Sequence, residues 1–171
     1  YTPFDDEGTK ARKTYLIRDG VMAGRLHNAS TAVDFGENLT GNARAISFEY
    51  EPIVRMTNTY IEPGKTPLCS LIGEVDNGFL IDTIKSGFGS TNFTVSPIIA
   101  YRIRRGTIAE PVKISLLTGN SFGTLFKIDG ISDRASLGEN PFVTCSKRDQ
   151  LRLPIDFGGP YVRISEIDVV G

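Results

Sequence analysis

Apolar and polar residues alternate in many short runs along this chain, and these runs predict strands. The segment 13–26 reads KTYLIRDGVMAGRL, in which an Asp-Gly pair separates two alternating stretches. Asp-Gly is typical of the two-residue turn of a β-hairpin, so we expect a hairpin here. From Phe79 onward the pattern is mostly that of strands, with a further turn near Arg105-Gly106, and alternation returns in LRLPIDFGG and YVRISEIDVVG near the C-terminus.

Helical signals occur in three places between these runs. Residues 28–36, NASTAVDFG, begin with a residue that can cap a helix and end at a glycine. In 66–78, TPLCSLIGEVDNG, a Thr-Pro start precedes apolar residues at i, i+3, i+4 and i+7. The whole pattern predicts an α+β fold, β-dominated, with mostly antiparallel sheet and two or three short helices. A third helix is expected within 119–133, with its apolar side formed by Phe122, Leu125, Phe126 and Ile128.

Length and charge narrow the class of protein further. The chain has 171 residues, which suits a single domain over 1–171. Lys and Arg number 19 against 20 Asp and Glu, so no basic excess supports direct binding of nucleic acid. No apolar run approaches the ~20 residues that span a bilayer, so we expect no membrane contact. Two cysteines are too few for a disulfide framework, and we expect a cytoplasmic protein.

The N-terminus reads YTPFDDEGTKARK and has neither an apolar signal core nor an initiating Met. We therefore expect a fragment of a longer chain or a processed product. The three carboxylates of FDDEG lack the spacing of a calcium loop and are interpreted as a solvated turn. His27 is the chain's one histidine, and we expect a surface or capping role for it rather than a metal-ligand role.

Cys145 lies in the stretch FVTCSKRDQLRLP at 142–154. A cysteine between strand-like segments is most often a small buried apolar residue. A disulfide with Cys69 is not expected in the cytosol. A nucleophile would need a base, and a metal ligand would need further donors that no spacing brings together. From the residues alone, the role of Cys145 stays open.

The chain resembles the C-terminal domain of the TldD/PmbA family, also known as modulators of DNA gyrase. The resemblance rests on an ordered set of motifs that spans nearly the whole chain, of which RMTNTYIEPG is the most specific. The set is FDDEG at 4–8, LIRDGVMAGRL at 16–26, TGNARA at 40–45, PIVRMTNTYIEPG at 52–64, AYRIRRG at 100–106, PVK at 111–113, LLTGN at 116–120, CSKRDQ at 145–150 and the terminal GGPYVRISEIDVVG.

The resemblance implies a zinc metalloprotease that acts on unfolded or extended peptides. In TldD-type members two zinc-binding His come from an upstream His-Glu-x-x-x-His helix, whose Glu acts as general base. A third ligand is a Cys in a Cys-Gly-Lys-x-Gly-Gln-like segment, which corresponds to Cys145 here. PmbA-type subunits lack this Cys, so Cys145 indicates the TldD type.

Two departures from the family pattern leave an alternative open. Ser146 and Asp149 stand where the family has glycines, and the metal-binding helix is missing from this chain. We expect zinc in the full-length protein, with none bound to this fragment, which alone should be inactive. The alternative is a non-catalytic scaffold or assembly subunit of the same family.

Substrate and partners follow from the same interpretation. The strands from Arg55 to Ile61 could present an edge to an extended peptide by strand addition. Arg55 and Asn58 are predicted to face substrate, with hydrogen bonding to backbone or at a domain interface as the alternative. The expected partners are a peptide substrate, an upstream N-terminal domain of the same chain, and a family member in a homo- or heterodimer.

Overall fold

The computed structural model describes residues 2–137 and 144–171, and the chain forms two compact units. Unit 1 comprises Tyr1–Tyr60 with Leu137–Gly158, and unit 2 comprises Ile61–Ser136 with Gly159–Gly171. Each unit therefore joins segments that are far apart in sequence. Strands dominate both units and helices are short, so the predicted β-dominated α+β class is confirmed. A single domain over 1–171 stays a prediction.

Unit 1 opens with the predicted hairpin. Strands β1 (Ile17–Arg18) and β2 (Val21–Met22) pair antiparallel, with Ile17 opposite Met22. The turn between them has Asp19 at φ 52° and Gly20 at φ 77°. Asp and Gly adopt this left-handed backbone more readily than other residues, which is why the dipeptide marked the turn.

The first predicted helix is also confirmed. Helix α1 (Ala29–Phe35) begins after Asn28, whose side chain accepts a hydrogen bond from the Thr31 N–H in a reciprocal capping box. The helix ends at Gly36, which has a left-handed backbone with φ 63°. Both ends are thus set by residues within the helix's own sequence.

The rest of unit 1 consists of short strand pairs, of which β5 with β13 joins the two chain segments. The stretch 53–64 forms two short strands separated by residues 55–57. Strands β3 and β4 pair antiparallel, as do β11 and β12, whereas β5 pairs in parallel with residues 156–158 of β13. Their bounds are β3 (Ala43–Arg44), β4 (Ile53–Val54), β5 (Asn58–Tyr60), β11 (Thr144–Lys147), β12 (Gln150–Pro154) and β13 (Asp156–Ile164).

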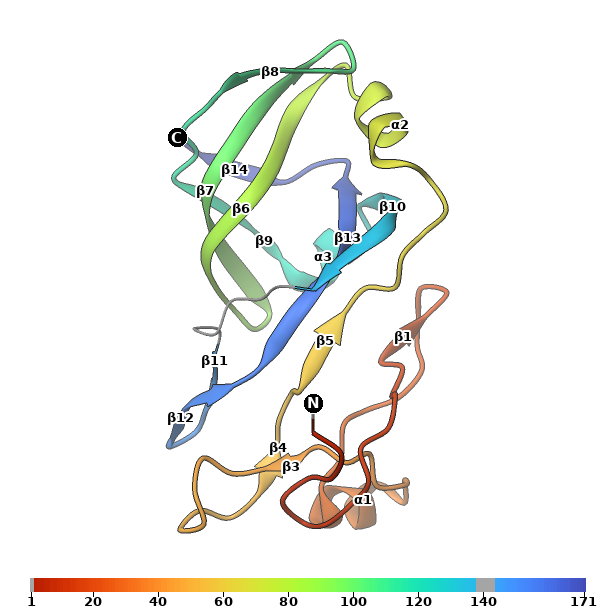
Figure 1. The fold of residues 1–171 in the computed structure, drawn as a ribbon, viewed down its shortest axis with the longest axis vertical. Helices are drawn as coiled ribbons and strands as arrows, with labels where there is room; N and C mark the ends of the chain where they lie inside the picture. Colours follow the sequence, from red (N-terminus) through yellow and green to blue (C-terminus); the bar gives the residue numbers. More distant parts are fainter. Residues whose placement is uncertain (1, 138–143) are drawn as a thin grey trace. The chain divides into compact units, whose positions relative to one another are not determined.

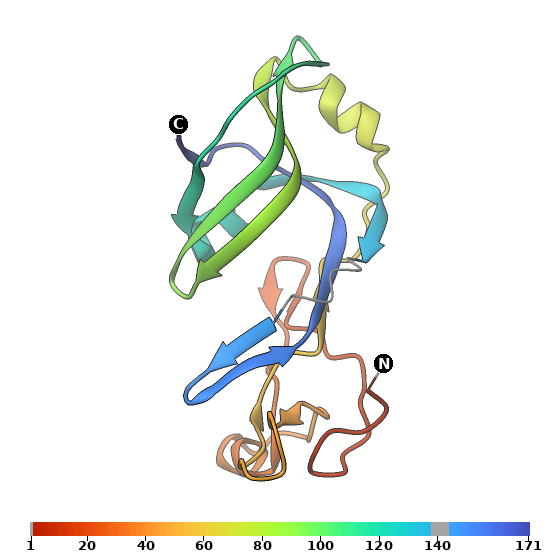
Figure 2. The ribbon, with the colours of Figure 1, turned by 60° about the vertical axis from the view of Figure 1, so that its left-hand side comes forward.

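Unit 2 is built on one large antiparallel sheet, in which the long strands β6 and β7 lie side by side in both ribbon views (Figures 1 and 2). The strand order is β14-β9-β7-β6, and β8 also pairs with β7. Ala100, Ile114 and Leu117 form the buried cluster on this sheet. The strands are β6 (Asn77–Gly89), β7 (Asn92–Arg104), β8 (Thr107–Pro111), β9 (Leu116–Asn120) and β14 (Asp168–Val170).

The two helices of unit 2 are shorter than predicted. Helix α2 (Leu68–Gly73) ends where the chain turns into β6, and Thr66 does not cap it because it bridges to Ser132 instead. Leu71 of the predicted apolar face is buried, at 5% exposed. The predicted extent of this helix was wrong: the Val75 and Asp76 carbonyls accept hydrogen bonds from the Gly106 and Arg105 N–H groups, and β6 begins at Asn77.

Helix α3 (Ser121–Leu125) departs further from its prediction over 119–133. Phe122 and Phe126 are 62% and 86% exposed, so the predicted apolar side is not buried among the described residues. Ile128 belongs to the following strand β10 (Ile128–Leu137) rather than to the helix. Within residues 2–137 and 144–171, no helix has the length and apolar character needed to cross a membrane.

Two equivalent turns allow a matched test of packing in the fold. Arg105-Gly106 and Asp19-Gly20 have nearly the same backbone, with Gly106 at φ 72° and Gly20 at φ 77°. A Cβ on Gly106 would lie 2.5 Å from the Gly73 carbonyl oxygen, whereas one on Gly20 would meet nothing within 4 Å.

We expect Gly20→Ala to lower the free energy of unfolding by about 1–2 kcal/mol, the cost of a left-handed backbone with a Cβ. Gly106→Ala should cost a further ~1–3 kcal/mol because the helix end must shift. Urea denaturation of both variants measures the difference. Equal losses in the two variants would contradict the close approach at Gly73.

Candidate functional site

Cys145 lies on the β11–β12 hairpin, drawn in blue in Figure 2. Its thiol is free and half-buried, and its backbone pairs with buried Leu153 on the opposite strand. The pairing shifts between Cys145 and Lys147, which marks a β-bulge next to the cysteine. The turn carries Arg148 at φ 56°, so this hairpin uses a left-handed non-glycine residue to reverse direction.

Arg55, immediately after β4, contacts both strands of this hairpin. Its side chain is among the most buried in the chain, with a residue exposure of 1%. Nη2 donates to the Cys145 carbonyl oxygen, and Nη1 donates to the Gln150 carbonyl oxygen at 3.3 Å. A single guanidinium therefore joins the first strand of the hairpin to the second.

Gln150 and Lys147 attach the hairpin to the preceding segments of unit 1. Gln150 is 3% exposed; its Oε1 accepts from the Ile46 N–H at 3.2 Å and its Nε2 donates to the Glu51 carbonyl at 2.8 Å. Lys147 Nζ donates to the Val54 carbonyl at 2.8 Å. Side chains of the hairpin thus bond to main-chain groups of β4 and of the loop before it.

Arg44, on β3, is a second arginine beside Cys145. Its guanidinium donates to the Met56 carbonyl at 2.9 Å and to the Pro154 carbonyl at 3.0 Å. Burial lowers the pKa of Arg44, and the charge of Arg55 acts in the same direction, whereas Asp6 and Cys145 oppose it. The surroundings of Cys145 are therefore rich in positive charge and in donors directed at main-chain carbonyls.

The predicted substrate residues differ in their placement. Arg55 is buried and bonds to main-chain carbonyls, which matches the alternative of backbone hydrogen bonding. Asn58 is exposed on β5, opposite Asp156 of β13. The structure thus brings Arg55 to Cys145 and leaves Asn58 accessible, and contact of either residue with substrate stays a prediction.

A surface or capping role was expected for His27, and the surface alternative is wrong because the side chain is buried. It is 2% exposed, with Nδ1 3.1 Å from Thr31 Oγ1 and Nε2 2.8 Å from Glu37 Oε2. The solvated turn expected at FDDEG is also partly wrong, because Asp5 is buried and accepts hydrogen bonds from the Thr9 and Ala43 N–H groups. His27 and Asp5 therefore have structural partners already.

A zinc ion needs three or four ligands, which makes the donor set the decisive test. Among residues 2–137 and 144–171, no group of three His, Cys, Asp or Glu side chains is arranged to hold a metal. A free, half-buried thiol has the chemistry of a zinc ligand. Cys145 therefore fits zinc as one ligand, and residues 2–137 and 144–171 do not supply the other ligands around it.

Sequence reasoning did not identify Arg44, Gln150 or the particular carbonyls to which Arg55 bonds. Their partners on the opposite segment lie 90 to 110 residues away along the chain. A local pattern of alternation carries no information about such contacts. The available signal was that Arg44 and Gln150 both fall inside motifs of the family resemblance.

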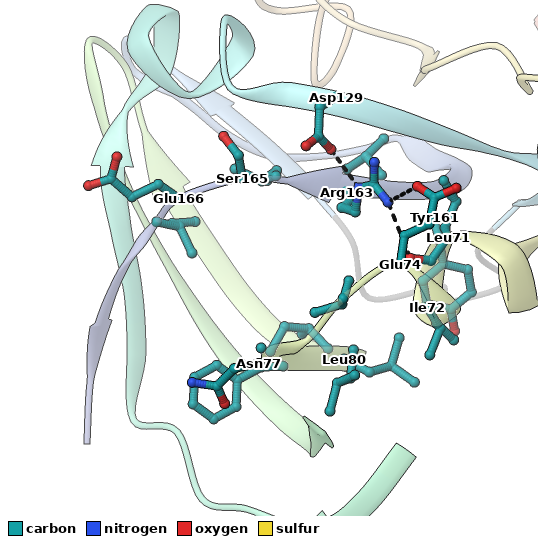
Figure 3. A pocket seen from close by; sticks show the side chains of 18 of the residues that line it. Leu71, Ile72, Glu74, Asn77, Leu80, Asp129, Tyr161, Arg163, Ser165 and Glu166 are labelled. Atoms are coloured by element: carbon teal, nitrogen blue, oxygen red, sulfur yellow. Dashed lines mark hydrogen bonds and ion pairs between the residues drawn. The ribbon is translucent and has the colours of Figure 1, made fainter. Parts of the chain in front are cut away.

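A second candidate is the pocket of unit 2, shown in Figure 3, with a volume of about 690 Å³. Arg163 donates to Asp129 at 2.7 Å and pairs with Glu74, while the Tyr161 hydroxyl donates to Asp82 at 3.0 Å. These polar groups already satisfy one another, which leaves few to orient a ligand. We therefore regard the Cys145 hairpin as the better candidate site.

Comparison with known proteins confirms the family resemblance. A family model described as the PmbA/TldA metallopeptidase C-terminal domain matches residues 1–171. The chain therefore belongs to this family of metallopeptidase C-terminal domains.

Curated relatives and solved structures agree with this assignment. The chain is 43% identical to a metalloprotease of Synechocystis sp. over 98% of its length, and 34% identical to a metalloprotease TldD homolog of Haemophilus influenzae, also over 98%. These matches cover 36% and 35% of those relatives, so the chain spans just over a third of their length. A zinc metalloprotease TldD homolog of Saccharolobus solfataricus is 29% identical, with 98% of this chain and 38% of the relative covered.

Among solved structures, TldE from Thermococcus kodakarensis is similar to this chain with a TM-score of 0.78 at 25% identity. A Thermotoga maritima protein described as a modulator of a DNA gyrase has a TM-score of 0.70, also at 25% identity. Each comparison covers 99% of this chain, and 36% and 35% of the respective solved chains. The fold of the whole chain is thus shared within the family.

The unit 2 pocket gives a prediction for alkaline pH. Burial, followed by the hydrogen bond to Asp82, raises the pKa of Tyr161. The folded protein then keeps the phenol proton to higher pH than the unfolded chain, so stability is lost as pH rises past ~10. Tyr161→Phe should lose less stability between about pH 9 and 11 than the unsubstituted protein. Denaturation at several pH values in this range, with Tyr50→Phe as control, measures how the free energy of unfolding changes with pH. The same pH dependence in Tyr161→Phe as in the unsubstituted protein would exclude this contribution of Tyr161.

Proposed function

We propose that this chain is the part of a zinc-dependent peptidase that contributes Cys145 as one zinc ligand. The observation that carries the proposal is a free, half-buried thiol on a hairpin held by buried side chains. The names of the relatives support the metalloprotease class, and that of the Saccharolobus solfataricus relative supports zinc. The remaining ligands would come from outside this chain, as the family resemblance implies.

Zinc bound with three protein ligands keeps a position for water, lowers the pKa of that water and polarises a peptide carbonyl. Within this chain, Cys145 would supply the thiolate donor. The contacts from Arg55 and Gln150 would keep the Cys145 side chain in one orientation toward the other ligands. Such pre-set geometry lowers the cost of assembling a metal site.

The peptide substrate could align along β5. Among the described residues, β5 pairs with β13 alone, so its other edge is open. Thr57 accepts a hydrogen bond from the Asp156 N–H at 3.2 Å, so its carbonyl faces β13. Main-chain groups of successive strand residues alternate between the two edges, which directs those of Asn58 and Tyr60 to the open edge. An extended peptide could pair there through backbone hydrogen bonds.

The zinc assignment predicts a difference between the chain's two cysteines. In the full-length protein, Cys145→Ala should lose most of its bound zinc and its peptide cleavage, because a three-ligand site loses one donor. Cys69→Ala removes an exposed thiol of unit 2 and should keep both. Metal content by atomic emission and cleavage of an unfolded peptide measure the two effects. Unchanged zinc and cleavage in Cys145→Ala would refute the ligand assignment, whereas the absence of both from the unsubstituted protein would favour the scaffold alternative.

The peptide-edge assignment predicts a difference between neighbouring prolines on β5. Asn58→Pro removes an N–H at the open edge and should weaken peptide binding while the fold remains. Thr59→Pro removes an N–H that faces β13 and should reduce stability. Fluorescence anisotropy of a labelled unfolded peptide and thermal unfolding separate the two results. Asn58→Ala, which keeps the N–H, isolates the predicted side-chain contact. Full peptide affinity in Asn58→Pro would argue against binding at this edge.

Contact with an upstream N-terminal domain and dimer formation with a family member remain predictions. They concern surfaces whose partners lie outside this chain. A cytoplasmic location also remains a prediction.

A further inference from the structure

We infer that Arg55 is the positioning residue that fixes the Cys145 thiol for its role as a metal ligand. This inference rests on the proposed function. It replaces the predicted contact of Arg55 with substrate by a contact with the hairpin that carries the ligand. The argument depends on the burial of Arg55, on the two carbonyls it contacts, and on the bulge beside Cys145.

The burial of Arg55 is costly, which indicates a specific role. A buried ion without a counter-charge loses hydration that neutral partners replace only in part. At 1% exposure, Arg55 is bonded to two carbonyl oxygens, and its Nε is buried without a partner among the described residues. An apolar side chain of similar volume would avoid this cost. What it could not do is bond to both strands of the hairpin.

The bulge explains why the hairpin needs such a contact. Regular pairing holds Cys145 opposite Leu153 and Lys147 opposite Gln150, but the ladder shifts between them. A bulge locally interrupts the hydrogen bonds that would fix the adjacent backbone. Arg55 bonds to the carbonyls of Cys145 and Gln150, one on each side of this interruption. It thereby supplies a constraint that the strand ladder lacks at the cysteine.

Arg55 is itself held by its main chain. Its N–H donates to the Asn42 carbonyl at 2.8 Å, and the Asn42 side chain donates to the Arg55 carbonyl at 3.2 Å. Asn42 is buried, with 6% exposure. The backbone of Arg55 is thus fixed on both polar groups, so the guanidinium reaches the hairpin from a rigid base.

Lysine could not perform this function. Arginine presents a planar fork of donors that can bond to two separate acceptors at once, whereas lysine has one nitrogen on a flexible stem. Arg55→Lys therefore keeps the positive charge near Cys145 and removes the two-point contact. This substitution separates positioning from electrostatics.

The test uses the full-length protein with Cys69→Ser, which leaves Cys145 as the one thiol of this chain. Arg55→Lys should weaken zinc binding by about 10- to 100-fold, the usual effect of losing support for a ligand. It should also raise severalfold the rate at which the metal-free Cys145 reacts with a thiol reagent, because the hairpin opens. Chelator competition and reagent absorbance measure the two effects. The control is Arg104→Lys, because Arg104 is exposed and pairs with Glu110.

Unchanged zinc affinity and thiol rate in Arg55→Lys would overturn the positioning role, whatever Cys145 does. A faster thiol with unchanged zinc, together with full zinc in Cys145→Ala, would instead refute the proposed function alone. Hydrogen exchange distinguishes local opening of the hairpin from general unfolding of the Arg55→Lys variant. Protection should fall in 144–154 and 42–56 and persist in β6 and β7. A uniform loss that includes β6 and β7 would show a general stabilising role and overturn the inference.

Discussion

The contact of the buried Arg55 guanidinium with two main-chain carbonyls is the constraint on which the candidate site depends. The hairpin it holds has a bulge beside Cys145 and a turn with a left-handed arginine, so its own pairing is irregular. Gln150, Lys147 and Arg44 add further bonds from side chains to main chain. Bonds of this kind fix the backbone path, since they tie carbonyls and N–H groups rather than flexible side-chain ends. The result is a thiol whose place is set by its surroundings.

Local signals were sufficient wherever an element's ends are decided by its own residues. The Asp19-Gly20 turn and the Asn28 cap of α1 are of this type, because each satisfies backbone requirements within a few positions. Prediction failed where distant pairing competes with local preference. Helix α2 stops at Gly73, after which the turn at 105–106 bonds to the Val75 and Asp76 carbonyls, and Ile128 belongs to β10 rather than to α3. In both places the helix keeps the first part of its apolar pattern, while the last residue of each pattern, Val75 or Ile128, lies beyond the helix.

The residues of the candidate site show the same contrast between local signals and distant contacts. Cys145 was singled out by its motif, and its bulged position on a hairpin adds the structural context. Arg55 was also named, and its bonds to main-chain carbonyls match the alternative of backbone hydrogen bonding, while its contact with substrate stays a prediction. Its partners at Cys145 and Gln150 are 90 and 95 residues away. Contacts at that separation depend on the complete topology, which short alternating runs leave undetermined.

The division of unit 1 into two distant chain segments has a consequence for how the protein is made. Tyr1–Tyr60 leaves the ribosome long before Leu137–Gly158, with most of unit 2 synthesised in between. The Arg55 side chain can therefore bond to the hairpin only after residues 144–154 have been synthesised. Because these segments are far apart in sequence, their contact forms slowly compared with local turns. The environment of the Cys145 thiol is accordingly among the last parts of the chain to be completed. Until then the newly made protein carries its candidate metal ligand without the surroundings that orient it.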